Sequence, residues 1–169
     1  MTARIPLTPL TAAAFAPFGE VLEASGPPDR VINQGNCGRF HDLATLVAEG
    51  GGRIGVNLFD ALPRALPYTL DMVERHPLGS QAFLPMHPHP WLVIVTPDEG
   101  GIPGRPQAFR AAPGQGINFA PGTWHGVLTP LAAPGLFAVV DRIAPDGEDP
   151  AANLEEHWFE APWQVVEPG

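Results

Sequence analysis

Proline and glycine interrupt this sequence at short intervals along its whole length, and this restricts its fold more than any other feature. The 169 residues include 22 prolines and 19 glycines. Inside a helix a glycine costs about 1 kcal/mol and a proline about 3 kcal/mol relative to alanine, so long helices are excluded. Hydrophobic residues nevertheless make up 44% of the chain, which a disordered chain does not usually carry. The sequence therefore predicts one all-β domain over residues 1–169, with a few short helices.

Short apolar runs between these breaks recur every 8–12 residues or so, a spacing typical of strands in an antiparallel barrel or sandwich. The candidate strands are 4–7, 19–23, 30–33, 39–42, 53–59, 70–76, 81–86, 91–96, 107–111, 116–119, 124–129, 136–143 and 158–166. Short helices are expected at 11–17, with Thr11 as N-cap, and at 149–156. We expect a barrel, with 81–86 and 91–96 joined as a hairpin.

The charge balance excludes several classes of partner. Asp and Glu number 18 against 9 basic residues, all of them arginine, for a net charge of −9. An acidic chain without a basic stripe is a poor partner for nucleic acid or for an anionic membrane. The absence of lysine excludes a Schiff-base mechanism. A small carboxylate substrate would have to be held by arginine, histidine, backbone N–H groups or a metal.

Cysteine usage and hydropathy point to the cytoplasm. Cys37 is the single cysteine, which excludes an internal disulfide and a cysteine-rich zinc site. The N-terminal residues lack the basic and apolar regions of a signal peptide, and no apolar run is long enough to span a membrane.

Four residues have the spacing of a metal site. Glu74 and His76 are two apart, so they share one face of a strand, and Gln81 follows a Pro-Leu-Gly turn. A Pro-Gly turn later precedes His125. This arrangement resembles the cupin pattern His-x-His-x4-Glu followed by Gly-x5-Pro-x-Gly-x2-His, with Glu74 replacing the first histidine and Gln81 the glutamate. Such oxygen and nitrogen donors suit a divalent first-row metal.

Structural roles are the alternative for these residues. His76 precedes a proline and would then lie in a turn, while Glu74 would form an ion pair with Arg75 or Arg142. A second His-x-His pair, His87 and His89, is flanked by prolines and has no acidic residue at ligand spacing. We expect that pair on the pocket rim or the surface rather than in a metal site.

Two further polar clusters are candidates for substrate contacts. Arg39 can hold a carboxylate through two parallel hydrogen bonds, and His41 beside Asp42 can act as an acid or base. The pair Asp141 and Arg142 ends an apolar strand, where a purely structural ion pair is also common.

Together these segments resemble the ureidoglycolate lyase family (once called ureidoglycolate hydrolase), a cupin-like family of allantoin and purine catabolism. The run His-Pro-Leu-Gly-Ser-Gln-Ala-Phe is its most specific motif. The segments that carry the resemblance are Pro6-Leu7-Thr8, 15–22, 39–43, 74–86, 114–118, Trp124-His125 and Val139-Val-Asp-Arg142.

The resemblance implies a cytoplasmic homodimer that cleaves the C–N bond of (S)-ureidoglycolate to glyoxylate and urea, with a divalent metal such as nickel. Glu74, His76, Gln81 and His125 would hold the metal, and His41, His76 and His125 would be the catalytic residues. Residues expected to bind substrate are Arg39 or Arg142 at the carboxylate, and Asn33 and Asn118 at the ureido group.

Three departures from the family pattern leave the substrate open. Gly126 stands where a second histidine is usual, Ile143 and Ala144 replace a Gly-Gly pair, and the 87–89 histidines are unusual. The alternatives are another cupin C–N lyase or hydrolase acting on a related 2-hydroxy or 2-amino acid, and a non-catalytic cupin that binds a small molecule.

Overall fold

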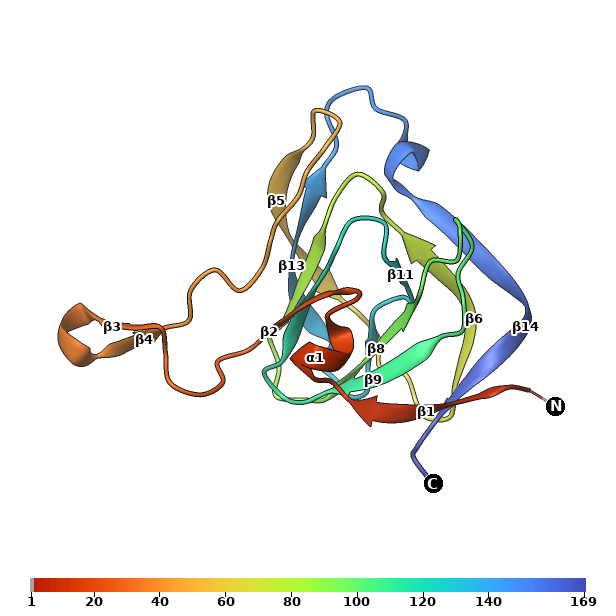
Figure 1. The fold of residues 1–169 in the computed structure, drawn as a ribbon, viewed down its shortest axis with the longest axis horizontal. Helices are drawn as coiled ribbons and strands as arrows, with labels where there is room; N and C mark the ends of the chain where they lie inside the picture. Colours follow the sequence, from red (N-terminus) through yellow and green to blue (C-terminus); the bar gives the residue numbers. More distant parts are fainter. Residues whose placement is uncertain (1) are drawn as a thin grey trace.

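A computed structural model describes residues 2–169, and strands dominate it (Figure 1). The larger sheet has the strand order β11-β6-β14-β1-β9-β8-β12, and β11 also pairs with β8, which closes all of these strands except β12 into a barrel. Its strands are β1 (Arg4–Pro9), β6 (Tyr68–Arg75), β8 (Trp91–Thr96), β9 (Gln107–Ala111), β11 (Trp124–His125), β12 (Thr129–Pro130) and β14 (Glu155–Val166).

A second, antiparallel sheet has the order β2-β10-β7-β13-β5. Its strands are β2 (Gly19–Leu22), β5 (Arg53–Asp60), β7 (Gln81–Pro85), β10 (Gly116–Phe119) and β13 (Leu136–Ile143). The helical segments are short, because proline and glycine limit them: α1 (Ala12–Phe15) and two 3₁₀ turns, Asn33–Gly35 and Pro150–Asn153. Thr11 caps α1 by accepting a hydrogen bond from the Ala14 N–H, as predicted.

Strand β8 separates two apolar cores, and this explains its uninterrupted apolar sequence. Side chains alternate across a strand, so Val93 and Val95 face the space between the two sheets while Leu92 and Ile94 face the barrel interior. All six residues of β8 are buried. Aromatic side chains fill the space between the sheets: Phe15, Phe18, Phe83, Trp91, Phe109, Phe119 and Phe137.

The all-β prediction with few short helices is confirmed, and the departures concern pairing. Strand β1 runs parallel to both neighbours, β9 and β14, so the barrel is not wholly antiparallel. The connection 86–90 is not a hairpin, because β7 and β8 lie in different sheets. The expected strand 124–129 is interrupted, because the Gly126 N–H bonds outside a ladder to the Ile94 carbonyl.

The C-terminal region also differs from its prediction. The helix expected over 149–156 is only the 3₁₀ turn Pro150–Asn153, and β14 begins at Glu155 rather than at residue 158. Pairing with β6 extends the strand at this end, since Glu155 lies opposite Arg75 and Glu156 lies opposite Glu74. Among the described residues no helix is long and apolar enough to cross a membrane.

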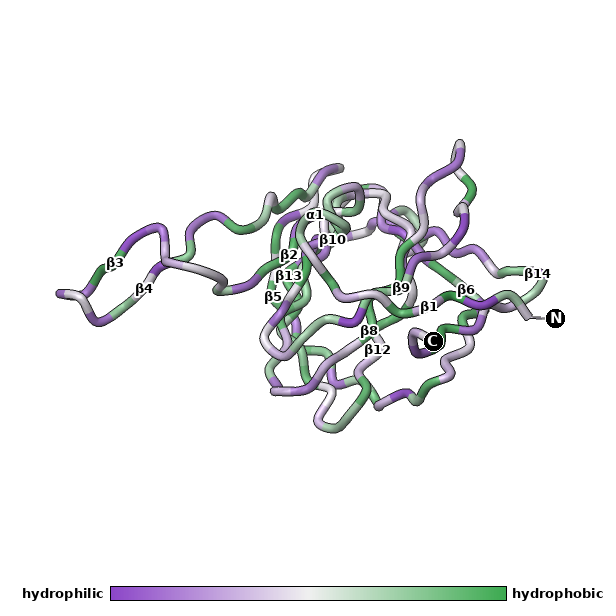
Figure 2. Tube along the Cα trace, turned by 60° about the horizontal axis from the view of Figure 1, so that its bottom comes forward, coloured by the Kyte–Doolittle hydropathy of each residue, from purple (hydrophilic) through white to green (hydrophobic). Residues whose placement is uncertain are grey.

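One feature projects from the body of the molecule. Strands β3 (Arg30–Ile32) and β4 (Cys37–Arg39) form a separate hairpin on the side of the five-stranded sheet, as both Figure 1 and Figure 2 show. Every residue from 29 to 39 is exposed. At the hairpin's base the His41 N–H donates to the Asp29 carboxylate (2.8 Å). Residues 29–41 are called the arm below.

Candidate metal centre and adjoining pocket

Neighbouring strands bring three candidate metal ligands together. His125 on β11 lies directly opposite Glu74 on β6, and His76 follows β6 by one residue. One ligand atom from each of these three residues lies within 4.8 Å of the other two. The predicted grouping of Glu74, His76 and His125 is therefore present, and Glu74 pairs with neither Arg75 nor Arg142.

Hydrogen bonds to backbone carbonyls set the tautomer of both histidines. Nδ1 of His76 bonds the Asn153 carbonyl (2.8 Å), and Nδ1 of His125 bonds the Gly126 carbonyl (3.1 Å). A carbonyl oxygen only accepts, so each Nδ1 carries the hydrogen and each Nε2 keeps a free lone pair. Both Nε2 atoms are buried, and neither has a hydrogen-bond partner among the described residues.

Gln81 offers a fourth acceptor. Its Nε2 donates to Oδ2 of Asp141 (3.2 Å), whose other oxygen accepts from Nδ2 of Asn57 (2.8 Å). The amide is thereby fixed with Oε1 on its other side, and that atom is also buried without a partner in the described chain. Gln81 lines one cavity with His76 and a second, smaller one with Glu74 and His125. Three buried acceptor atoms without a partner, from His76, Gln81 and His125, thus belong to residues that line these two cavities, as Glu74 does, and a cation would satisfy them.

Burial shifts the proton affinity of two of these groups. His125 is fully buried, and its ring stacks on Phe119 with centroids 4.3 Å apart and planes 6° apart. Desolvation, with a smaller contribution from nearby His76, lowers the pKa of His125 to about 3. Desolvation raises the pKa of Glu74, a shift opposed by His76 and increased by Glu156. His125 is therefore neutral at physiological pH, as a metal ligand must be.

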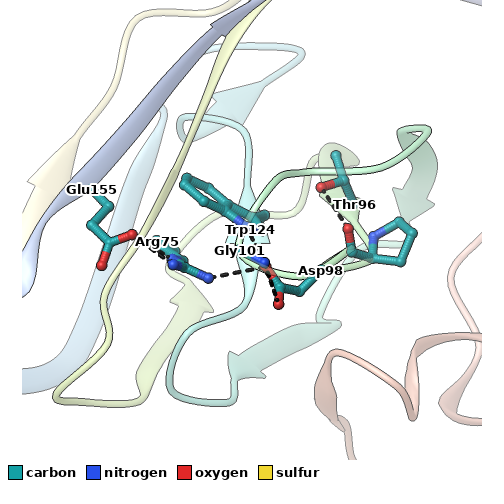
Figure 3. Close-up of polar contacts among 7 residues, drawn as sticks. Arg75, Thr96, Asp98, Gly101, Trp124 and Glu155 are labelled. Carbon is teal, nitrogen blue, oxygen red and sulfur yellow. Dashed lines mark hydrogen bonds and ion pairs between the residues drawn. The ribbon is translucent and has the colours of Figure 1, made fainter.

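A polar cluster that includes the neighbours in sequence of Glu74 and His125 links their strands (Figure 3). Arg75, next to Glu74, forms ion pairs with Asp98 (3.0 Å) and Glu155 (2.6 Å) and lies 4.4 Å from the centre of the Trp124 ring. Trp124, next to His125, donates its indole N–H to Asp98 (2.9 Å). The cluster joins β6, β11 and β14, so it fixes the backbone that carries Glu74 and His125.

A cavity of about 300 Å³ adjoins the candidate metal centre, a size suited to a small substrate. His76 and Gln81 form part of its wall, with Ser80, Asp141, Arg142 and Glu148 around them. Arg142 donates two hydrogen bonds to the Glu148 carboxylate (2.7 and 2.6 Å) and others to the Glu49 and Gly50 carbonyls. The cation predicted to hold a carboxylate is thus at the pocket, but it is already paired.

The remaining predicted residues lie elsewhere. Asn118 is buried, donates to Glu20 and to the Thr45 carbonyl, and does not line the pocket. Asn33, Arg39 and His41 are all on the exposed arm, where Arg39 bonds Nδ1 of His41 (2.9 Å). A single copy of the chain does not bring these residues to the metal ligands.

His87 and His89 are not in the group formed by Glu74, His76 and His125. Their rings stack 5.6 Å apart, and His87 packs edge-on against Phe137 with centroids 4.8 Å apart. His87 is buried rather than on the surface, and desolvation lowers its pKa. Neither residue lines the 300 Å³ cavity.

Sequence reasoning missed the residues that orient the ligands. Asn153 anchors His76 from 77 positions away, and Asn57 and Asp141 fix Gln81 from other strands. Only the Asp141-Arg142 pair gave a sequence signal, and its partners proved to be Gln81 and Glu148 rather than each other.

Comparison with known proteins identifies the family. The sequence model described as "Ureidoglycolate lyase" matches residues 2–166. The chain belongs to the ureidoglycolate lyase family. It is 56% identical to the ureidoglycolate lyase of Rhodobacter capsulatus over 96% of this chain and 98% of that one. It is 50% identical to ureidoglycolate lyase 2 of Rhizobium meliloti, over 95% and 96% of the two chains.

Two further proteins are similar to this chain at lower identity. The ureidoglycolate lyase of Agrobacterium fabrum is 46% identical over 99% of both chains. A solved dTDP sugar isomerase from Desulfovibrio desulfuricans G20 aligns over 86% of this chain and 87% of its own at 14% identity, with a TM-score of 0.41. That structural score is too low to support any argument about the ureidoglycolate lyase family.

Proposed function

We propose that this chain is a ureidoglycolate lyase that cleaves the C–N bond of (S)-ureidoglycolate to give glyoxylate and urea, in allantoin and purine catabolism. The observation that supports this most strongly is the grouping of Glu74, His76 and His125 beside a pocket sized for a small acid. Both histidines, and Gln81 in the pocket wall, have a buried acceptor atom without a partner among the described residues. Similarity to proteins named ureidoglycolate lyase over nearly the full length supports the substrate.

The donor set fits a divalent first-row metal such as nickel. Two neutral imidazoles, a carboxylate and an amide oxygen are suitable ligands, and two of the residues are already oriented through hydrogen bonds on their other side. We propose that Glu74, His76, Gln81 and His125 hold this metal. When bound, the metal would contact the substrate carboxylate and hydroxyl and lower the pKa of that hydroxyl.

The reaction needs little from the protein besides proton transfer and orientation. Ureidoglycolate is a carbinolamide, so loss of its hydroxyl proton allows a carbonyl to form as the C–N bond breaks. The departing urea nitrogen must gain a proton, because the urea anion is a poor leaving group. We propose that His41 takes up the hydroxyl proton and passes a proton to the departing nitrogen, so that no net proton is consumed. His76 and His125 would act by holding the metal through their Nε2 lone pairs.

Recognition of the substrate carboxylate falls mainly to Arg39 in this proposal. Arg142 faces the pocket, but it would have to give up Glu148 to take a substrate carboxylate. Arg39 bonds only the ring of His41 among the described residues, so its remaining N–H groups are available. Asn33 on the same arm would contact the ureido group, while the bonds of Asn118 to Glu20 and Thr45 favour an indirect role for it.

We also propose that the enzyme is a homodimer in the cytoplasm and acts on small carboxylates. The net charge of −9 and the single cysteine support this over binding to nucleic acid or secretion.

Purified protein without a histidine tag tests the proposal. With (S)-ureidoglycolate we expect stoichiometric release of glyoxylate and urea, together with about one divalent metal per chain. His76→Ala should lose the metal and the activity, whereas His89→Ala, a matched histidine outside the cluster, should keep both.

Other outcomes would contradict the proposal. Turnover of a related 2-hydroxy or 2-amino acid without turnover of ureidoglycolate would identify a different C–N lyase or hydrolase. Tight binding of ureidoglycolate without any product would identify a non-catalytic binding protein. Loss of metal in His89→Ala but not in His76→Ala would show that His87 and His89 are the metal ligands instead.

A further inference from the structure

The arm is a hairpin that one copy of the chain leaves without support. Its two strands pair only with each other, in a sheet separate from the rest of the described chain. A two-stranded hairpin is marginally stable in water unless it packs against something else. Yet Val31 is 62% and Ile32 38% exposed on the arm. Figures 1 and 2 both show the arm extending away from the barrel rather than along it.

The outer face of the five-stranded sheet is apolar and uncovered on the same side of the molecule. On β5, Val56 is 72% exposed and Leu58 65%. Leu58 lies opposite Ala138 on β13, and Ala138 lies opposite Leu84 on β7, so these residues form one row across the sheet. Leu84 is also exposed. Uncovered apolar surface of this kind marks an interaction site.

The arginine in the pocket wall is paired with a carboxylate, whereas the arm carries an arginine that has no carboxylate partner among the described residues. The charged residues in the pocket wall are Asp141, Glu148 and Arg142, and the one arginine is paired with Glu148. The arm offers Arg39, which has no carboxylate partner among the described residues, already hydrogen-bonded to His41. Strand β13 links the two surfaces, because Ala138 is on the outer face while Asp141 lines the pocket. Charge complementarity therefore favours the arm's approach to an acidic pocket mouth.

We propose that the arm of one copy lies across the five-stranded sheet of a second copy and delivers Arg39 and His41 to the second copy's pocket. Each site is then built from two chains, and the two-fold arrangement covers both apolar surfaces at once. Arg39 binds the substrate carboxylate and His41 faces the departing urea. This inference rests on the proposed function, since it is the carboxylate substrate that calls for the arginine.

Mixing two inactive variants tests the exchange. Arg39→Ala should lose about 100-fold in kcat/KM but keep its metal, because a charge-assisted contact to substrate is removed. His125→Ala should lose both metal and activity. After dissociation and reassociation in equal amounts, half the dimers are mixed, and each contains one complete site. We expect recovery to about one quarter of wild-type activity from this random pairing.

The matched control pairs His76→Ala with His125→Ala. Both changes lie in the metal set of one copy, so this mixture should stay inactive. Mixed dimers of Arg39→Ala and His125→Ala that show no recovery would overturn the proposal and would mean that each arm serves its own pocket. A wild-type protein that is monomeric by light scattering would overturn it too.

A second experiment does not depend on turnover. Cys37 is the only cysteine and lies on the arm, so a photoreactive maleimide can be attached there to dissociated chains. After reassociation of ¹⁵N-labelled with unlabelled chains, illumination should link Cys37 of one isotopic form to β5 or β13 peptides of the other. Links within one isotopic form only would contradict the exchange. The double variant Val56→Asp, Leu58→Asp should be monomeric and should still bind metal.

The two experiments separate the two proposals. Links between copies without cleavage of ureidoglycolate would reject the proposed function and retain the arm exchange. Cleavage with links only within a copy would retain the function and reject the exchange.

Discussion

At the scale of single residues, the site depends on hydrogen-bond acceptors that fix the orientation of His76, His125 and Gln81. The Asn153 and Gly126 carbonyls accept hydrogen bonds from Nδ1 of His76 and Nδ1 of His125. The Asp141 carboxylate accepts one from the amide of Gln81. Each leaves one acceptor atom directed into the site. Hydrogen bonds to the far side of a ligand commonly fix its orientation and strengthen metal binding.

Asp141→Ala should weaken metal binding without unfolding the protein. Without Asp141 the Gln81 amide is free to rotate, and loss of a group that orients a ligand typically costs about 10–100-fold in metal affinity. Competition titration with a chromophoric chelator measures the change. Asn57→Ala is the matched comparison, because Asn57 also bonds Asp141 but not Gln81, and it should have the smaller effect. Equal affinity of Asp141→Ala and wild type would contradict this role.

The lowered pKa of Glu148 leads us to expect that its contribution to the free energy of unfolding is lost in acid. Hydrogen bonds from Arg142 hold the pKa of Glu148 below its usual value. A depressed pKa in the folded state stabilises the protein at pH values above the carboxyl pKa of the unfolded chain, about 4.3. This contribution is lost as the pH falls through the lower folded-state value. Urea unfolding should therefore show that Glu148→Gln is less stable at neutral pH, with the difference shrinking below about pH 4. Parallel pH profiles for the two proteins would rule this out.

At the scale of elements, strand positions followed from sequence more readily than strand partners. β8, β10 and β13 agree with their predicted ranges, since apolar runs bounded by glycine and proline mark strands directly. The pairing of β1 with both β9 and β14 joins segments that are distant in sequence. No local pattern specifies such a pairing, because it depends on which apolar faces fit together in three dimensions.

The absence of a side chain at Gly19 allows β2 to approach β10 closely. Its φ is +146°, and a Cβ there would lie 1.8 Å from the Asn118 carbonyl oxygen. Gly19→Ala should cost about 3 kcal/mol in the free energy of unfolding, from the clash together with the backbone strain. Gly114→Ala is the matched control: φ is +83° but the space is open, so about 1 kcal/mol is expected from the backbone alone. Chemical denaturation of both variants measures these values, and equal costs would show that the close approach is unimportant.

At the scale of the whole molecule, we expect the two apolar cores to unfold together, because β8 contributes side chains to both. Val93 and Val95 contribute to the core between the sheets, and Leu92 and Ile94 to the barrel interior. If β8 detached, apolar side chains of both cores would be exposed to solvent. The candidate metal centre lies where the sheets meet, with Glu74 and His125 from the barrel and Gln81 from the second sheet.

Shortening a buried side chain on either face of β8 should therefore lower the stability of the whole domain. Leu92→Ala should cost about 2–5 kcal/mol, and Val93→Ala somewhat less because fewer atoms are removed. Both variants should unfold in a single transition at a lower temperature, seen equally by tryptophan fluorescence and by circular dichroism. Leu62→Ala, at a position 82% exposed, should change stability by less than about 0.5 kcal/mol. Two separate transitions in either core variant would show that the sheets unfold independently.

The sequence by itself determined that this chain is an all-β domain and that Glu74 and His76 are close to each other, while the resemblance to the cupin pattern predicted that His125 joins them. Frequent proline and glycine forbid long helices, and residues two apart on a strand share a face whatever the rest of the fold does. Tertiary structure alone decided what surrounds those residues. Asn153 reaches His76, Glu148 neutralises Arg142, and the arm carries Arg39 and His41 away from the pocket. These relations join segments far apart in the chain, so the packing of the sheets sets them and no local residue pattern does.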